Sequence, residues 1–236
     1  MEKRSFTIYN RGRIVGVLTL PWRGAPLVVT CHGFYSTKDS EKYLLVEERF
    51  SEAGLGVLRF DFRGCGESNG RFEDTTLSGR LRDLETILDF VKPYTGRVGL
   101  LGSSFGGCVA LIASAKREEV KATVTLSTSP HMEEVFEKVF EEGGYSWVEA
   151  FKGRRDFWED LKNYNMEEIV GRVSHLLIIQ GTLDELVPTS HAEELYNLAR
   201  NPKKLEIIDG ADHTFTDPKD REKAIDISLK WFKKYL

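Results

Sequence analysis

Apolar residues along the chain form short continuous runs that alternate with stretches of helical periodicity. The run at 27–31 predicts a strand buried on both faces, and further strands are predicted at 56–62, 97–101, 122–127, 175–180 and 204–208. The periodic stretches predict helices at 39–53, 77–91, 104–116 and 190–200, with a last helix that reaches Leu236. This alternation indicates an α/β fold, a mostly parallel sheet of about eight strands with helices on both faces.

Two segments depart from this rhythm. Near the N-terminus, "SFTIYN" and "RIVGVLTLP" predict two strands joined by a hairpin at Asn10–Gly12. The interval 131–172 has no strand pattern, is acidic at first and is rich in aromatic residues. We therefore predict a small helical cap over 131–172, inserted within a single domain of residues 1–236. An insertion after the carboxyl end of a strand is placed to cover a site at that edge.

Composition and charge exclude several classes of function. The 236 residues carry a net charge of −4, with basic residues interspersed among acidic ones, so neither a nucleic-acid partner nor an anionic membrane is expected. No apolar run reaches the length of about 18 residues that insertion in a membrane needs. The N-terminus has no apolar core of signal-peptide length, which predicts a cytoplasmic location. The three cysteines lack the spacing of a zinc or redox site, so we expect small buried side chains and no metal.

The stretch "GLLGSSFGG" holds the strongest candidate for chemistry. Gly102-Ser103-Ser104-Phe105-Gly106 matches the pattern G-x-S-x-G, with Ser104 in the central place of a nucleophile elbow. The stretch follows a predicted strand and opens a predicted helix, which is the context this sharp turn requires. We therefore predict that Ser104 is a nucleophile and that Ser103 packs locally.

A serine nucleophile needs a base and an acid that orients the base. Among five histidines, His213 in "DGADHTF" is the candidate base because it lies in a short polar loop between a strand and the last helix. Asp184 in "IIQGTLDELVP" is the candidate acid because it follows the end of a buried strand, at the sheet edge where ligands bind. Asp209 is the second choice, and Asp212 is disfavoured as the chain neighbour of His213.

The oxyanion of an acyl-transfer reaction needs two N–H donors. We expect one from the backbone of Phe105, directly after the nucleophile, and the other from the backbone of Phe34 in "CHGFYS". Gly33 is expected to let the backbone turn so that the Phe34 N–H points into the site. Tyr35, His131, Trp147 and Trp158 are the candidates for the substrate pocket.

Taken together, "HGF", "FDFRGCGES", "GSSFGG", "GTLDELVP" and "GADHTF" resemble the α/β-hydrolase superfamily, in the family's order and over essentially the whole chain. The short cap and the HGF form are similar to cinnamoyl and feruloyl esterases and to serine aminopeptidase-like hydrolases. The resemblance implies no metal and no organic cofactor. It also implies that Asp61 and Arg63 pair to hold loops near the active-site floor.

The resemblance implies a serine hydrolase that cleaves carboxylic esters of small acyl or aryl substrates through an acyl-enzyme. Two alternatives stay open. A peptidase or acylpeptide hydrolase would use the same three residues, with an acidic cap residue such as Glu137 or Glu141 holding an amine. A non-catalytic ligand-binding module on the same scaffold is disfavoured because Ser104, Asp184 and His213 are all present.

Overall fold

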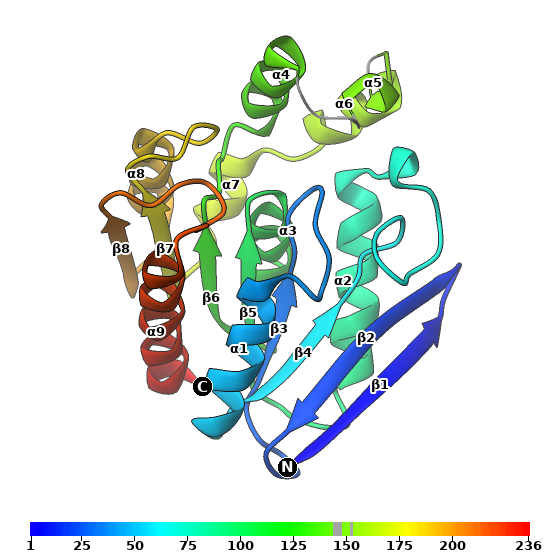
Figure 1. Cartoon of the computed structure of the whole chain (residues 1–236), viewed down its shortest axis with the longest axis vertical. Helices are drawn as coiled ribbons and strands as arrows, with labels where there is room; N and C mark the ends of the chain where they lie inside the picture. Colours follow the sequence, from blue (N-terminus) through cyan, green and yellow to red (C-terminus); the bar gives the residue numbers. More distant parts are fainter. Residues whose placement is uncertain (144–147, 152) are drawn as a thin grey trace.

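The computed structural model describes residues 1–143, 148–151 and 153–236 and contains one twisted sheet between two layers of helices (Figure 1). The order of its eight strands is β1-β2-β4-β3-β5-β6-β7-β8. Their bounds are β1 Glu2–Tyr9, β2 Arg13–Leu20, β3 Leu27–Cys31, β4 Gly56–Phe60, β5 Val98–Ser103, β6 Val120–Leu126, β7 Leu176–Gly181 and β8 Lys203–Ile208. The predicted α/β fold is confirmed.

The sheet is antiparallel only at its N-terminal edge. Strands β1 and β2 form the predicted hairpin, and β2 also pairs antiparallel with β4. All the remaining neighbours, from β4 through β3 to β8, are parallel. The carboxyl ends of β3, β5, β7 and β8 therefore lie at the same edge, and the loops that follow them can meet there.

The two helical layers follow from alternation along the buried strands. In β3, Val28 belongs to a core shared with α1 (Glu41–Glu52) and α9 (Pro218–Tyr235). Its neighbour Val29 faces the opposite core, to which the helices between β6 and β7 also contribute side chains and against which four helices pack along the flank of the sheet. These helices are α2 (Leu77–Val91), α3 (Phe105–Ser114), α7 (Met166–Val170) and α8 (Thr189–Leu198). Burial on both faces explains the apolar character of β3, β4, β5 and β7, in which every residue is buried. The edge strand β8 differs, because Ile208 is its only buried residue.

The interval between β6 and β7 contains only helices among its described residues. They are α4 (Met132–Glu142), α5 (Val148–Phe151), α6 (Arg155–Lys162) and α7. Figure 1 shows α4, α5 and α6 beyond the carboxyl edge of the sheet, at the top of the view. By contrast, α7 packs beside α3 and α8 on the flank of the sheet. Within 131–172, the elements that overhang the sheet edge are thus α4, α5 and α6.

A short 3₁₀ turn, η1 (Phe72–Asp74), precedes α2. Within the described ranges, no helix is both long enough and apolar enough to cross a membrane.

Candidate active site

Ser104 occupies a sharp turn between the end of β5 and the start of α3. Its backbone has φ 53° and ψ −125°, a combination that costs free energy for a residue with a side chain. Neighbouring chains approach closely: a Cβ at Gly106 would lie 2.2 Å from the Cys31 carbonyl oxygen, and one at Gly102 would lie 2.5 Å from that of Gly106. The glycines of the motif are required by close packing, and the turn presents the Ser104 hydroxyl at the sheet edge.

The hydroxyl of Ser104 begins a series of hydrogen-bonded side chains that continues through His213 to Asp184. The Oγ of Ser104 lies 3.1 Å from Nε2 of His213, in the loop after β8. The Nδ1 of His213 lies 2.9 Å from each carboxylate oxygen of Asp184, in the loop after β7. An Nδ1–H that donates to Asp184 leaves Nε2 free to accept a proton from Ser104, the tautomer that a general base needs.

The carboxylate of Asp184 is fully buried and well supplied with donors. Its Oδ1 accepts from the backbone N–H groups of Leu186 and Val187, and its Oδ2 accepts from Nε2 of Gln180 at 2.8 Å. Burial raises the pKa of this carboxyl, but the hydrogen bonds, with that from His213 first, outweigh burial and hold the pKa below its usual value. Asp184 is therefore an ionised acceptor beside His213.

The two other candidate acids have different partners. Asp209 accepts from the hydroxyl of Thr182 at 3.0 Å. Asp212 accepts from the backbone N–H of Thr216 at 2.8 Å and is held in its own turn. Neither is hydrogen-bonded to His213, so the geometry distinguishes Asp184 from the alternatives that the sequence left open.

Phe34 and Phe105 lie next to each other beside Ser104, with ring centroids 5.3 Å apart. Phe105 is the first residue of α3, so its N–H is one of the four that a helix cannot bond internally. The expected role of Gly33 needs correction, because its φ lies outside the left-handed region. A Cβ at Gly33 would instead stand 3.8 Å from the Ser104 Cβ, on the wall of the cavity. Its lack of a side chain keeps space open beside the serine.

A buried arginine holds the loop that carries Phe34. Arg80 on α2 is 1% exposed, and its guanidinium donates to the carbonyl oxygens of His32, Gly33 and Phe34 at 3.3, 2.8 and 2.5 Å. Its planar group also lies 5.2 Å from the centre of the Phe105 ring. Because one rigid group binds three consecutive carbonyls, it sets the direction of the intervening N–H groups. Sequence reasoning missed Arg80, whose only signal is a charge on the apolar face of a helix.

A second anchor of the same loop is the buried His32. Its Nδ1 lies 2.9 Å from the Gly33 carbonyl oxygen, and its Nε2 accepts from the Phe62 N–H at 3.0 Å. Burial, assisted by the nearby Arg80 charge, lowers the pKa of His32 to about 3. The neutral imidazole of His32 therefore connects the loops after β3 and β4 by hydrogen bonds.

Asp61 and Arg63 hold loops, but they do so through different partners and do not pair with each other. Asp61 accepts from the backbone and the ammonium of Lys38 at 2.7 and 3.0 Å. Arg63 pairs with Asp83 of α2 at 2.6 Å. The segment thus ties the loop after β4 to the loop after β3 and to α2.

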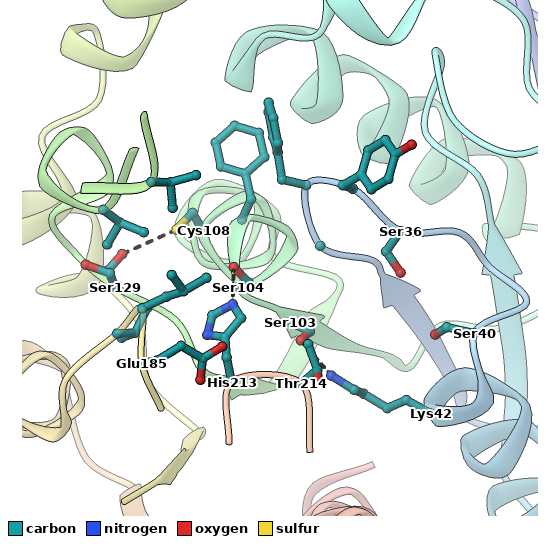
Figure 2. A pocket seen from close by; sticks show the side chains of 18 of the residues that line it. Ser36, Ser40, Lys42, Ser103, Ser104, Cys108, Ser129, Glu185, His213 and Thr214 are labelled. Carbon is teal, nitrogen blue, oxygen red and sulfur yellow. Dashed lines mark hydrogen bonds between the residues drawn. The ribbon is translucent and has the colours of Figure 1, made fainter. Parts of the chain in front are cut away.

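A cavity of about 520 Å³ opens above Ser104 and His213. One side is apolar and is built from Phe34, Phe105 and the face of α4 that carries Met132, Val135, Phe136 and Val139. The other side is polar, and Figure 2 shows Ser36, Ser40 and Lys42 there, with Ser104 between them and Ser129 on the opposite side. The site can hold a small molecule with one apolar end and one polar end.

The candidate pocket residues fall in different places. Tyr35 lines the cavity and is 65% exposed. His131 is directed to Glu194, with 2.7 Å between Nε2 and Oε2, and Trp158 packs on Phe140 and Phe157. Neither His131 nor Trp158 is among the described residues that line the cavity. Trp147 lies outside the described residues.

The sequence pattern predicted a helical cap, but sequence reasoning did not name the apolar residues of α4 that line the cavity, although their spacing is a signal. Positions 132, 135, 136 and 139 recur at helical spacing and mark one face of the helix. The rings further along, Phe151 and Phe157, are fully buried and pack against Phe34. These rings attach the overhanging helices to the body of the protein, and the face of α4 lines the cavity.

Within the described residues, no group of three or more His, Cys, Asp or Glu side chains is arranged to hold a metal ion. Cys31, Cys65 and Cys108 are buried free thiols, and burial raises the pKa of each.

Comparison with known proteins places the chain in a family. The family model described as serine aminopeptidase, S33, matches residues 24–141, and the model described as BAAT / acyl-CoA thioester hydrolase C terminal matches residues 87–234. The Bacillus subtilis protein named putative esterase YitV is 27% identical over an alignment of 237 positions, gaps included, that covers 91% of each chain. The Escherichia coli protein named uncharacterized protein YfhR is 29% identical over 191 residues. This match spans 75% of the present chain but 62% of YfhR.

The fold has counterparts among solved structures. Est1E from Butyrivibrio proteoclasticus, with ferulic acid bound, gives a TM-score of 0.81 at 24% identity over 97% of this chain and 99% of that one. At this identity the likeness concerns the fold alone. The family matches together extend from residue 24 to residue 234 and include the Ser104 turn and the loops of Asp184 and His213. The chain therefore belongs to the α/β-hydrolase superfamily.

Proposed function

We propose that the protein is a serine hydrolase that cleaves carboxylic esters of small acyl or aryl substrates through an acyl-enzyme. The observation that carries the proposal is the hydrogen-bonded series Ser104–His213–Asp184, which ends at the floor of the cavity. The names of two similar proteins, a putative esterase and a structure with ferulic acid bound, agree with this reaction class.

In the first half of the proposed reaction, Ser104 Oγ attacks the ester carbonyl carbon while Nε2 of His213 takes the hydroxyl proton. The ionised Asp184 stabilises the imidazolium that forms. The N–H groups of Phe34 and Phe105 are the proposed donors to the tetrahedral oxyanion. Arg80 acts on this step as a positioning residue, because it sets the direction of the loop that carries Phe34.

The imidazolium then gives its proton to the leaving alcohol, and the acyl group remains on Ser104. In the second half, water attacks the acyl-enzyme with His213 again as the base, which releases the acid and restores the hydroxyl. We propose that α4 to α6 act as a cap that excludes bulk water, with the apolar face of α4 receiving the acyl group. This assignment would limit the substrates to those whose acyl and alcohol parts together fit within about 520 Å³.

The adjacent serines provide a matched test of this reaction. In a panel of p-nitrophenyl esters, Ser104→Ala should lower kcat by roughly 10³-fold or more. Ser103→Ala, which removes a hydroxyl one residue away, should retain most of the activity. A fluorophosphonate probe should label the wild type and fail to label Ser104→Ala. Ester hydrolysis that survives in Ser104→Ala and is lost in Ser103→Ala would contradict the assignment.

A peptidase is the second candidate, because one matching family model is described as serine aminopeptidase. Glu137 and Glu141, the acidic residues that would hold an amine, are exposed and are absent from the described lining of the cavity. Aminoacyl amides in the same panel decide between the two reactions. A kcat/KM for amides above that for esters would favour the peptidase.

A further inference from the structure

The polar side of the cavity contains a cation whose charge is not paired. Lys42 lies in the first turn of α1, and its Nζ donates to the Ser103 hydroxyl at 2.9 Å. Figure 2 shows the side chain reaching from α1 toward Ser103 and Thr214, beside His213. Across the described chain, no carboxylate oxygen lies within 4.0 Å of this ammonium. By contrast, the ammonium of Lys38 in the preceding loop contacts three carboxylates.

A second cationic side chain in the described lining of the cavity is already paired with a carboxylate. Arg221, at the start of α9, pairs with Glu41 at 2.8 Å and donates to the carbonyl oxygens of Phe215 and Thr216. A partly buried Lys42 without such a partner has lost hydration, and its described contacts are a neutral hydroxyl and the face of the Phe215 ring, 5.6 Å away. This cost is offset when an anion enters the cavity.

Burial lowers the pKa of Lys42 to about 8, with Asp212 and Asp184 acting in the opposite direction and Arg221 adding to the effect. The amine is therefore mostly protonated at pH 7. A second donor lies nearby, because the hydroxyl of Ser40 is buried and makes no hydrogen bond within the described part of the chain. Ser40 and Lys42 lie on the same side of Ser104 (Figure 2).

The location of Lys42 indicates which part of a substrate it meets. Nε2 of His213 must face the oxygen of the leaving alcohol in order to protonate it. Thr214 follows His213 and forms the wall of the cavity toward Lys42. The apolar face of α4 packs through Phe136 on Phe34 and Phe105. Figure 1 shows α4 beyond the sheet edge and away from α1, which carries Lys42. The leaving group therefore extends over the polar side, toward Lys42.

We propose that Lys42 binds a carboxylate carried by the leaving alcohol, so that the preferred substrates are esters whose alcohol part is an anionic hydroxy acid. A single unpaired ammonium matches one carboxylate, whereas a dianionic phosphate would need a second free cation. The inference rests on the proposed ester hydrolysis, because the leaving alcohol is defined by that reaction.

Three matched aryl esters, two butyrates and one glutarate, test this assignment at about pH 7. Phenyl butyrate has a neutral leaving group, and 3-(butanoyloxy)benzoate carries a carboxylate on the same ring. Phenyl hydrogen glutarate places the carboxylate on the acyl part instead. Each is assayed with the wild type, Lys42→Met, Lys42→Arg and Lys230→Met. The last variant removes an exposed lysine near the C-terminal end of α9 and is the control for loss of one charge.

The expected result is a loss of about tenfold or more in kcat/KM for 3-(butanoyloxy)benzoate in Lys42→Met, with a change below about threefold for phenyl butyrate. Lys42→Arg should retain the preference, and Lys230→Met should match the wild type. Comparing variants on one ester cancels the difference in intrinsic reactivity between the two phenols. Equal losses on both butyrates, or a loss confined to the glutarate ester, would overturn the assignment.

Calorimetry separates this inference from the proposed function. In the Ser104→Ala background, 3-hydroxybenzoate should bind more tightly than phenol, and Lys42→Met should remove the difference. Absence of hydrolysis by the wild type would contradict the proposed function, whereas the binding comparison would still decide the role of Lys42. Equal binding of 3-hydroxybenzoate with and without the Lys42 ammonium would overturn the inference.

Discussion

The floor of the cavity and the helices above it are held in place by different interactions. The floor depends on backbone contacts and buried hydrogen bonds: Gly106 lies against the Cys31 carbonyl, and Arg80 binds three carbonyls of one loop. Helices α4 to α6 are attached by ring contacts, among them Phe151 and Phe157 against Phe34. Directional contacts tolerate little change, whereas apolar contacts accept side chains of similar volume.

Phe34 connects the two regions. Its backbone belongs to the loop held by Arg80, and its ring contacts Phe105 on the floor and Phe136 on α4. The comparison teaches that changes in the floor should affect the chemical step, whereas changes above it should affect stability or substrate choice. Four predictions follow in order of decreasing effect: the first three test that division, and the last concerns the stability that one residue of the floor contributes.

The largest effect is expected for the acid of the floor. Asp184→Asn should lower kcat by about 10³- to 10⁴-fold, because His213 loses the acceptor that fixes its tautomer. Asp209→Asn is the matched control, since Asp209 follows the neighbouring strand and bonds Thr182 instead. Steady-state kinetics with circular dichroism provides the measurement. If Asp209→Asn were inactive and Asp184→Asn active, the acid would be Asp209 in the loop after β8, and the present assignment would be wrong.

Removing the Arg80 guanidinium, which binds three carbonyl oxygens of the Phe34 loop, should have the next largest effect. Arg80→Met should reduce kcat by about 10²-fold, the loss typical of one oxyanion donor, with a much smaller change in KM. Arg117→Met is the control, because Arg117 pairs with Asp89 and Glu119 on the surface. An Arg80→Met protein with wild-type kcat and only a lower melting temperature would restrict Arg80 to a structural role.

Two substitutions in the helices above the floor should distinguish residues that attach these helices to the body from residues that line the cavity. Phe157→Ala removes a fully buried ring and should cost about 3–5 kcal/mol of stability while the relative kcat/KM among esters stays nearly constant. Val135→Phe narrows the cavity and should lower kcat/KM for hexanoate relative to acetate by about tenfold. Thermal melts and a series of acyl chain lengths measure both quantities. If Phe157→Ala changed the substrate preference and Val135→Phe changed only the stability, Phe157 would line the cavity and Val135 would serve attachment.

The smallest effect concerns the acid dependence of stability. The pKa of Asp184 in the folded protein lies below its usual 3.8, so its ionised form contributes stability above that pH, and the contribution is lost as the pH falls through the folded-state pKa. Each unit of this lowering corresponds to about 1.4 kcal/mol. Urea unfolding at pH 6 and pH 3 should therefore show a steeper loss for the wild type than for Asp184→Asn. Equal losses of unfolding free energy in the two proteins would show that Asp184 does not contribute to the loss of stability in acid.

Much of the sheet and the hydrogen-bonded series could be predicted because both leave local signals. Continuous apolar runs reveal strands buried on both faces, and the turn at Ser104 requires small residues at fixed spacing. The partners of Asp61 and Arg63 and the role of Gly33 were less accessible. These depend on which loops meet at the sheet edge, and no local pattern records such a meeting.

The sequence alone determined the order of strands and helices, the residue types at the sharp turn and the candidates for nucleophile, base and acid. Only the tertiary structure decided that Asp184 rather than Asp209 bonds His213 and that Arg80 binds the loop of Phe34. It also decided that Lys42 enters the cavity with no carboxylate partner among the described residues. The physical reason is range. Apolar periodicity and turn chemistry act between residues a few positions apart, whereas a buried hydrogen bond or an unpaired charge is defined by groups that are brought together from distant parts of the chain.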